Sequence, residues 1–284
     1  MTIDKHLGRS ADGTKNATYV TPNQIDKSLL VAVPRIENRE LYGIDENNLP
    51  FVGYDFWNCY EFSCLTLQGF PKTTILAITY DASSPNIVES KSLKLYLNSY
   101  NNVKCSDPYK TIQSDLEEII GAKVSVDSHW PCISSSSPMM RFSEYWPDSV
   151  LTTFELSEKE TPDVLQACDV TNFARKFGFL RSNCKITNQP DWGTVFVSMI
   201  GRCTPTNHSI AQYIMSFRNE NHFHEECCEM IYARLKAKFQ PDELFVACQY
   251  TRRGGIDINS YRASNPTLLR ILHDRAHFER TGNQ

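Results

Sequence analysis

The sequence predicts an α+β protein made of two similar modules in tandem, with antiparallel sheets covered by helices on one face. Both halves of the chain show the same order of patterns: strand, strand, helix, helix, strand. Short turns join the strand pairs, which favours antiparallel hairpins over βαβ crossovers. With 284 residues, 41% of them hydrophobic, the chain is long enough for two cores. We expect an N-terminal module over residues 1–150 and a C-terminal module over residues 151–284.

The first half opens with a predicted hairpin. Residues 55–67 and 73–80 are rich in aromatic and β-branched side chains, and the turn between them contains glycine and proline. A helix over residues 89–100 follows. Asn86 and Glu89 have the spacing of a capping box, so this helix is expected to begin just there.

The second helix of the first half has clear end signals. Asp107 is a good N-cap, Pro108 suits the first helical position, and Gly121 suits the C-terminal end. Residues 123–127 then alternate between polar and apolar, which predicts a strand.

The second half repeats this order of elements. Its aspartate-containing segment Gln189-Pro190-Asp191-Trp192-Gly193 has proline and glycine where a turn favours them, so it is predicted to join two strands. The expected elements are a strand ending near Cys184, a strand over residues 194–200, helices over residues 207–218 and 224–239, and strands over residues 244–251 and 256–261.

The net charge, the apolar runs and the cysteine usage of the chain exclude several classes of protein. The net charge of −4 gives no basic surface for direct nucleic-acid binding, and no apolar run reaches membrane-spanning length. The first residues contain no apolar stretch of a secretory signal, so we expect a cytoplasmic protein. None of the ten cysteines forms a C-x-x-C pair, which predicts free thiols. A serine-rich loop is expected at residues 133–138.

Cys184 and Asp191 are the first candidate pair for chemistry. A cysteine nucleophile reacts as the thiolate, and a carboxylate within reach can take its proton. A hairpin would allow Asp191 to fold back onto Cys184, but the spacing does not require it. On residue types alone, a small half-buried cysteine beside a turn aspartate is the simpler interpretation.

The helix start at Glu89 offers a second candidate. Its exposed N–H groups, together with Lys91 and Lys94, could bind a phosphate. The structural alternative is an acidic helix cap followed by two solvated lysines.

A third cluster lies around the start of the helix at residue 224. His222, His224 and Cys228 are metal-ligand types, but they match no standard zinc spacing. The structural alternative is an acidic first turn that complements the helix dipole. A further interpretation makes His224 a proton donor and Glu225 a hydrogen-bond acceptor for a ligand.

The fourth cluster is Arg252-Arg253-Gly254-Gly255, which joins two predicted strands. Guanidinium groups bind phosphate in a bidentate manner, and glycine lets the backbone approach it. A charged edge loop with a glycine bulge is the structural alternative. The chain contains no G-x-G-x-x-G sequence and no Walker lysine loop, so a dinucleotide would not bind through a Rossmann turn.

Together, and in this order, the four clusters resemble one family, the NADPH-dependent 7-cyano-7-deazaguanine reductases of the long, two-module type. The resemblance extends from about residue 28 to about residue 262. The segments that carry it are Glu89-Ser90-Lys91-Ser92-Leu93-Lys94-Leu95-Tyr96, Ser182-Asn183-Cys184, Gln189-Pro190-Asp191-Trp192-Gly193, Phe223-His224-Glu225 and Tyr250-Thr251-Arg252-Arg253-Gly254-Gly255.

This resemblance implies the tunnelling fold, in which β-β-α-α-β-β modules of paired chains assemble into a barrel, so a homodimer is expected. It implies a nitrile reductase (a preQ1 synthase) that converts 7-cyano-7-deazaguanine to 7-aminomethyl-7-deazaguanine. The reaction uses two NADPH and no metal, and belongs to queuosine biosynthesis for tRNA modification.

The resemblance also implies roles for individual residues. Cys184 is the nucleophile that forms a covalent thioimidate, and Asp191 and His224 transfer protons. Glu89, Ser90 and Glu225 bind the substrate. The expected cofactor-binding residues are Ser90, Lys91, Lys94, Arg252, Arg253 and Gly254.

Two alternatives remain open at this stage. A metal-dependent, cyclohydrolase-like purine or pterin enzyme of the same fold would use His222, His224 and Cys228. A non-catalytic purine-binding module would use the same pocket without a nucleophile.

Overall fold

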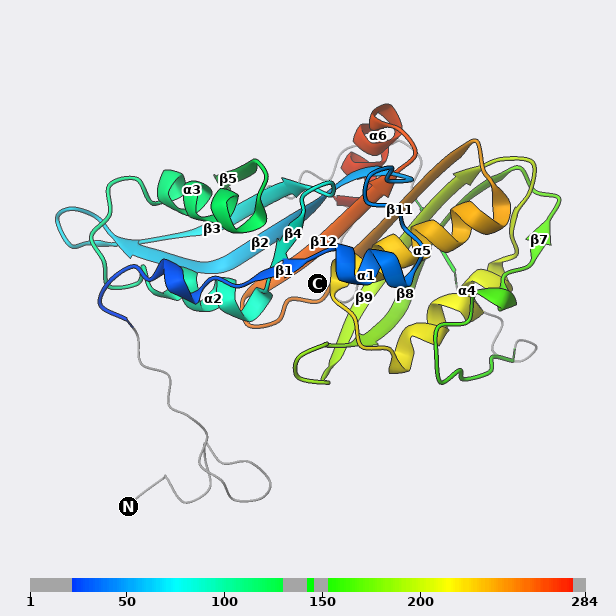
Figure 1. Ribbon diagram of the computed structural model, residues 1–284, viewed down its shortest axis with the longest axis horizontal. Helices are drawn as coiled ribbons and strands as arrows, with labels where there is room; N and C mark the ends of the chain where they lie inside the picture. Colours follow the sequence, from blue (N-terminus) through cyan, green and yellow to red (C-terminus); the bar gives the residue numbers. More distant parts are fainter. Residues whose placement is uncertain (1–21, 130–141, 146–152, 278–284) are drawn as a thin grey trace, which may run out of the picture.

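One twisted sheet runs through the length of the molecule (Figure 1). The computed structural model describes residues 22–129, 142–145 and 153–277. Neighbouring strands in this sheet are antiparallel, except for β6 and β8, which are parallel. In spatial order the strands are β5 (Val124–His129), β3 (Pro71–Asp81), β2 (Val52–Leu65), β12 (Ile256–Ala263), β11 (Glu243–Tyr250), β9 (Pro190–Ile200), β8 (Asn172–Asn183) and β6 (Ser143–Glu144).

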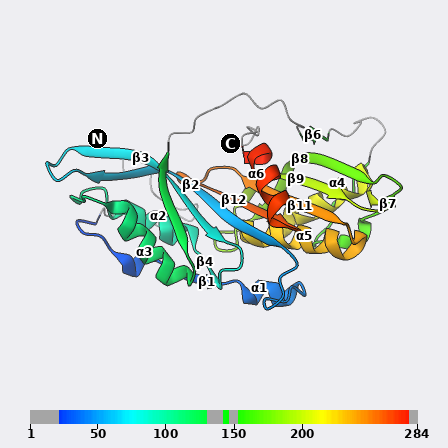
Figure 2. The ribbon, with the colours of Figure 1, turned by 90° about the horizontal axis from the view of Figure 1, so that it is seen from above.

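Helices cover both faces of the sheet, but unequally (Figure 2). Along β9, Val195 and Val197 pack in the core with α4 and α5, whereas Phe196 packs on the opposite face near α6. The α+β class is therefore confirmed, and one face carries most of the helices. The helices are α1 (Ile36–Leu41), α2 (Ser90–Asn98), α3 (Pro108–Ile120), α4 (Asn207–Met215), α5 (His224–Phe239) and α6 (Pro266–His277).

Two short ladders tie peripheral segments to this frame. They are β1 (Ala32–Pro34) with β4 (Asn86–Val88), and β7 (Ala167–Cys168) with β10 (Thr204–Pro205). The first ladder continues into the start of α2, because the Glu89 N–H donates to the Val31 carbonyl at 2.9 Å. The N-terminal segment therefore fixes the position of that helix start.

The ends of α3 agree with the sequence signals. Asp107 caps the helix by accepting from the Lys110 N–H, and Pro108 is its first residue. Gly121 ends it with φ of 75°, a left-handed conformation that glycine adopts without strain.

The capping box predicted for Asn86 and Glu89 is wrong. Asn86 belongs to β4, and its side-chain amide donates to the Ile119 carbonyl. Glu89 is itself the N-cap of α2, and its two carboxylate oxygens accept from the N–H groups of Lys91 and Ser92. The cap lies three residues later than predicted because a glutamate performs it alone.

The turn predicted at residues 189–193 is also misplaced. The chain reverses between Cys184 and Gln189, where Asn188 has φ of 54° and donates its N–H to the Cys184 carbonyl at 2.9 Å. Asp191 already lies inside β9. Gly193 serves the strand rather than a turn, because an added Cβ would lie 2.8 Å from the Gln249 carbonyl oxygen of β11.

The helix predicted over residues 207–218 is shorter than expected. The α-helix ends at Met215, and a 3-10 turn over Ser216–Asn219 continues it. This turn leads the chain to Asn221 beside the end of β8, where Asn183 and Asn221 form an isolated bridge. The segment that precedes α5 is thereby held against the β8–β9 loop.

The two halves share one sheet through β2 and β12, whose register runs from Cys59 opposite Ile256 to Val52 opposite Ala263. The C-terminal half has the full β-β-α-α-β-β order. In the described ranges, the N-terminal half places β2, β3 and β5 in this sheet, while β6 pairs with β8 of the other half. The division into residues 1–150 and 151–284 stays a prediction.

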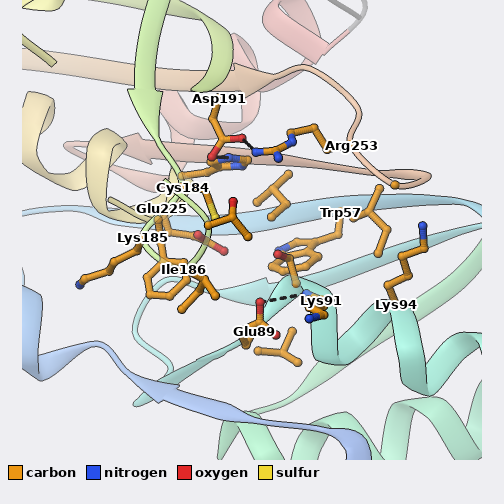
Figure 3. A pocket seen from close by; sticks show the side chains of 18 of the residues that line it. Trp57, Glu89, Lys91, Lys94, Cys184, Lys185, Ile186, Asp191, Glu225 and Arg253 are labelled. Atoms are coloured by element: carbon orange, nitrogen blue, oxygen red, sulfur yellow. Dashed lines mark hydrogen bonds and ion pairs between the residues drawn. The ribbon is translucent and has the colours of Figure 1, made fainter. Parts of the chain in front are cut away.

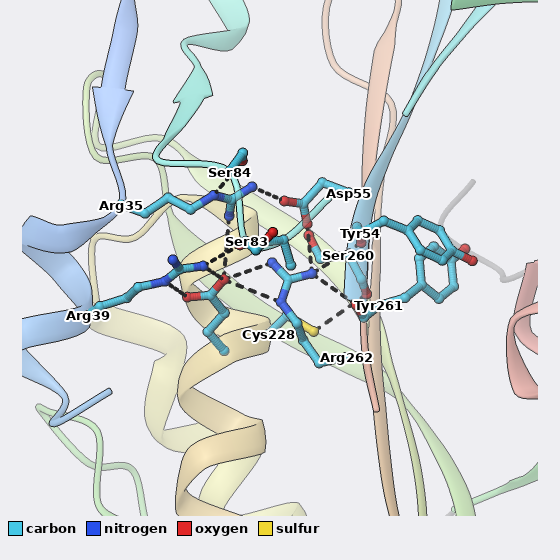
Figure 4. Close-up of polar contacts among 12 residues, drawn as sticks. Arg35, Arg39, Tyr54, Asp55, Ser83, Ser84, Cys228, Ser260, Tyr261 and Arg262 are labelled. Carbon is cyan, nitrogen blue, oxygen red and sulfur yellow. Dashed lines mark hydrogen bonds and ion pairs between the residues drawn. The ribbon is translucent and has the colours of Figure 1, made fainter. Parts of the chain in front are cut away.

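A buried group of charges also links the two halves (Figure 4). We call it the ionic cluster, and Asp55 and Glu229 are its two acids. Arg262 contacts Asp55 at 3.0 Å and Glu229 at 2.9 Å, and all three side chains are at most 3% exposed. Three arginines surround the two acids: Arg35, Arg39 and Arg262.

A last helix and one predicted loop complete the description of the chain. Residues 266–277 form α6, whose Leu272 packs against the sheet. The serine-rich loop at residues 133–138 lies outside the described residues. Among the helices that are described, none combines the length and the apolar character needed to cross a membrane. The nine cysteines in the described ranges are free thiols.

Candidate active site

A pocket of about 260 Å³ lies where the two halves meet (Figure 3). Its walls come from the first turn of α2, the first turn of α5, the β8–β9 loop and the turn between β11 and β12. Ten residues predicted for catalysis or binding line it, although they are spread over both halves of the chain. They are Glu89, Ser90, Lys91, Lys94, Cys184, Asp191, His224, Glu225, Arg253 and Gly254.

Arg252 is the predicted site residue that does not line this pocket. Its guanidinium lies over the Tyr60 ring, 3.7 Å from the centroid, whereas the neighbouring Arg253 faces the pocket. The two arginines therefore take different positions, although they are adjacent in the sequence and share the same charge.

Cys184 lies at the first position after β8, on a backbone held from several sides. Its N–H donates to the Gln189 carbonyl at 2.8 Å, and its carbonyl accepts from Asn188 and from the Asn221 side chain. The thiol faces the pocket from this fixed loop (Figure 3). Such an arrangement suits a nucleophile that must meet a bound electrophile in one geometry.

Asp191 is buried, lines the same pocket as Cys184, and contacts Arg253 and His224. Its Oδ1 accepts from Arg253, and its Oδ2 lies 3.4 Å from Nε2 of His224. Burial alone would raise the pKa of Asp191, but His224 and Arg253 reverse this effect and hold the pKa below its usual value. Asp191 is therefore a carboxylate that can accept a proton at neutral pH.

His224 is the first residue of α5 and has a fixed ring plane. The ring stacks on Tyr250 with 3.7 Å between centroids and 2° between the planes. Nε2 faces Asp191, while Nδ1 is buried without a hydrogen-bond partner. A histidine held in this way can pass a proton between the carboxylate and a ligand.

Glu225 is the most unusual carboxyl in the pocket. It is 2% exposed, and one oxygen, Oε1, has no hydrogen-bond partner. Burial, with help from the nearby charge of Asp55, raises the pKa of Glu225 to about 8, even though Arg35 opposes the shift. At neutral pH this side chain is predominantly protonated, so it can both donate and accept a hydrogen bond.

The α2 side of the pocket supplies a carboxylate and two lysines. Glu89 caps the helix through both oxygens. Lys94 lies 3.9 Å from Glu61 and is 37% exposed, so its ammonium group remains accessible to a ligand. Lys91 lines the same side. Positive charge and a helix N-terminus together suit phosphate groups.

The set of metal ligands considered for zinc is not brought together. His222 lines the pocket and contacts Glu220 at 3.2 Å. The Cys228 thiol points away, toward the carbonyls of Val246 and Ser260. Among the described residues, no group of three or more His, Cys, Asp or Glu side chains could hold a metal ion. The cyclohydrolase alternative thus loses the cluster on which it depended.

Sequence reasoning missed the apolar walls of the pocket. Trp57 on β2 is 1% exposed, and it lines the pocket together with Ile256 and Ile258 of the adjacent strand β12 and Phe223 before α5. In the sequence, Trp57, Ile256 and Ile258 look like ordinary core positions of strands. Only the pairing of β2 with β12, across the two halves, places them around one cavity.

Two family models match segments of this chain. Residues 21–128 match the family described as "Nitrile reductase, 7-cyano-7-deazaguanine-reductase N-term", and residues 190–267 match the family described as "QueF-like protein". Cys184 lies between the two matched segments, so its candidacy rests on its position in the pocket.

Curated relatives extend the match over most of the chain. The NADPH-dependent 7-cyano-7-deazaguanine reductase of Polaromonas sp. (strain JS666) is 37% identical over 270 residues, which cover 90% of this chain and 93% of that protein. The protein of the same name from Rickettsia canadensis is 38% identical over 278 residues, covering 90% and 96%. The one from Legionella pneumophila is 38% identical, covering 84% and 85%.

Proposed function

The chain belongs to the 7-cyano-7-deazaguanine reductase family, and from this premise we propose that it reduces the nitrile of 7-cyano-7-deazaguanine to the aminomethyl group with two NADPH. The observation that carries the proposal is a cysteine and a buried carboxylate–histidine pair lining one pocket. The product would serve queuosine modification of tRNA, as the family resemblance implies.

The chemistry begins with a covalent bond between Cys184 and the substrate. The Cys184 sulfur adds to the nitrile carbon, and its proton leaves to Asp191 while the nitrile nitrogen gains one, giving a thioimidate. A hydride and a proton convert the thioimidate to an amine that still carries the sulfur. Loss of the thiol leaves an imine, and a second hydride and proton give the primary amine.

NADPH supplies the two hydrides, and the chain's own residues supply the protons and the shelter. Oδ2 of Asp191 lies 3.4 Å from Nε2 of His224, so these two side chains can pass protons to the nitrogen of the substrate. The imine would hydrolyse in water, so a pocket with apolar walls such as Trp57 and Phe223 is suited to retain it.

We assign recognition of the deazaguanine ring to the two carboxyls at the helix starts. Glu225, with one unpartnered oxygen, and Glu89, at the opposite wall, can bind the polar edges of a flat ring. Ser90 lies beside Glu89. Apolar side chains from β2 and β12 can cover the faces of the ring.

For the cofactor phosphates we propose Lys91 and Lys94, beside the backbone of Ser90 and Gly254. These residues lie on one side of the pocket, and both lysines carry positive charge. Arg252 is not part of this proposal, because it stacks on Tyr60 outside the pocket.

The test follows NADPH absorbance in purified protein supplied with 7-cyano-7-deazaguanine. We expect two NADPH oxidised for each nitrile reduced, and a covalent adduct on the intact protein detected by mass spectrometry when NADPH is left out. Cys184→Ala should abolish both signals while the protein still binds the nitrile. An adduct on the Cys184→Ala protein would show that another nucleophile acts, and absence of turnover in folded wild-type protein would refute the reaction.

We also propose a homodimer, since the tunnelling fold closes its barrel from paired chains. Light scattering on the purified protein gives its mass directly. A monomer that turns over substrate would contradict this assembly without affecting the assigned chemistry.

A further inference from the structure

Arg253 occupies an unusually well-defined position at the edge of the pocket. It precedes the two-residue turn Gly254–Gly255, in which both glycines have positive φ, 56° and 80°. On either side of this turn, Arg253 and Ile256 exchange backbone hydrogen bonds of 2.9 and 3.1 Å. The side chain therefore starts from a rigid backbone rather than from a loose loop.

Both arms of its guanidinium are engaged by residues of the β8–β9 hairpin. One nitrogen donates to Oδ1 of Asp191, and the other donates to Oε1 of Gln189 at 2.5 Å. A phosphate that took the same two N–H groups would displace both partners, because each bond occupies one N–H of its nitrogen. Lys91 and Lys94, by contrast, have no such close partner among the described residues.

We propose that Arg253 is a positioning residue for Asp191. By binding Oδ1, it leaves Oδ2 to face His224, and it keeps the carboxylate ionised in a buried site. This inference rests on the proposed function, since it assigns Arg253 to the proton-transfer step. Gln189 completes the arrangement by fixing the second arm of the guanidinium.

The charges around Asp191 support this role. Burial raises its pKa, and the groups that lower it are His224 and Arg253. Other titratable groups on this side are the Cys184 thiol of the β8–β9 loop, the Cys227 thiol and Glu225 of α5, and the Tyr250 phenol of β11 under the His224 ring. Without Arg253, the burial effect meets less opposition, so Asp191 would stay protonated to a higher pH and accept no proton there.

The decisive experiment measures adduct formation with the nitrile, without NADPH, as a function of pH. In Arg253→Ala protein, we expect the acidic limb of the rate profile to move to higher pH by about one unit or more, because one of two pairing cations is lost. Arg253→Lys should restore part of the shift, since it returns the charge without the bidentate geometry. Gln189→Ala should give a smaller shift in the same direction.

Arg252→Ala is the matched control. It removes the same charge from the same turn region, but from a side chain that stacks on Tyr60. We expect its pH profile to stay in place. If Arg253→Ala also keeps the profile and raises only the KM for NADPH, Arg253 acts on the cofactor alone and the inference is wrong.

A second measurement needs no nitrile chemistry. The carboxyl carbon of Asp191 can be titrated by NMR in protein labelled with 13C-aspartate, with Asp191→Asn used to assign the signal. We expect the pH of its titration midpoint to rise in Arg253→Ala and to be unchanged in Arg252→Ala. An unchanged midpoint would overturn the inference even if the enzyme proved to have another substrate.

Discussion

The pocket and the ionic cluster both hold buried carboxylates beside arginines, yet the arginines differ in their exposure to solvent. In the cluster, Arg262 is fully buried between Asp55 and Glu229. In the pocket, Arg253 is 37% exposed while its partner Asp191 is 5% exposed. The cluster is closed to solvent and the pocket pair is open to it, so we expect the first to act in stability and the second in chemistry.

Helix α5 connects these two regions. Its first residues, His224 and Glu225, line the pocket, and Glu229, about one turn further on, belongs to the cluster. Glu225 also lines a small cavity together with Arg35, Asn38 and Glu229. A single helix start therefore carries side chains with proposed proton-transfer and substrate-binding roles beside a side chain of the ionic cluster, and substitutions along it should separate these roles.

Asp191→Asn should give the largest functional effect. We expect kcat to fall by about 10²- to 10⁴-fold, because the proposed proton acceptor for Cys184 is lost. The free energy of unfolding should fall by about 1–2 kcal/mol, because Asp191 is buried and loses charged hydrogen bonds, while the more exposed Arg253 can turn to water. Steady-state kinetics and denaturant melts on one preparation give both numbers. If the loss in free energy of unfolding were as large as the rise in activation free energy, Asp191 would act in stability as the cluster acids do.

Glu229→Gln should show the opposite pattern. It leaves three buried arginines with Asp55 as their one buried acid, and we expect about 3–5 kcal/mol of lost stability. Folded protein should keep kcat within a few fold. Denaturant unfolding measures the first quantity, and activity per folded molecule the second.

The matched control is Glu118→Gln, which removes the same charge from the exposed pair with Lys27. Its effect on the free energy of unfolding should stay within about 1 kcal/mol. If both variants destabilise equally, burial is not what gives the cluster its importance.

These contrasts explain why sequence patterns predict some parts of the molecule and not others. The ends of α3 follow from Asp107, Pro108 and Gly121, because capping depends on residues within one turn. The order of strands and helices follows from local periodicity in the same way. The individual roles of the pocket residues came from the family resemblance, and they await experiment.

Features that depend on distant segments escaped prediction. Gly193 was taken for a turn residue, but the close approach of β11 places it in a strand. Nothing in the sequence separates Arg252 from Arg253, and only the packing of their turn sends them to different partners. Arg39 and Glu229 of the ionic cluster stand 190 positions apart, so no local pattern could pair them.

Glu225 lies on α5 between the pocket and the ionic cluster, so its titration tests how the two regions differ. Its pKa in the folded protein is raised by burial to about 8, above the ordinary glutamate value. Between these two values the folded protein holds a proton that the unfolded chain has lost, so stability falls as pH rises. In Glu225→Gln this fall is absent.

The stability difference between Glu225→Gln and wild type should therefore grow with pH from about 5 to 8, at up to about 1.4 kcal/mol per pH unit. Thermal or denaturant melts at each pH measure it, and other titrating groups cancel in the difference. Parallel curves would mean that Glu225 is ionised in the folded state and hydrogen-bonds its substrate as a carboxylate.

The smallest predicted effect distinguishes two carboxylates that both cap helices but differ in their distance from the pocket. Glu89 caps α2 at the pocket, and Asp107 caps α3 away from it. Replacing either by alanine should cost about 1 kcal/mol of stability, because N–H groups at the helix start lose their acceptor. Only Glu89→Ala should also raise the KM for the nitrile. Glu89→Asp sharpens the test, since the shorter side chain can still cap but reaches less far into the pocket, and we expect stability to recover while KM stays high. If KM recovers together with stability, Glu89 acts on the substrate only by ordering the start of α2.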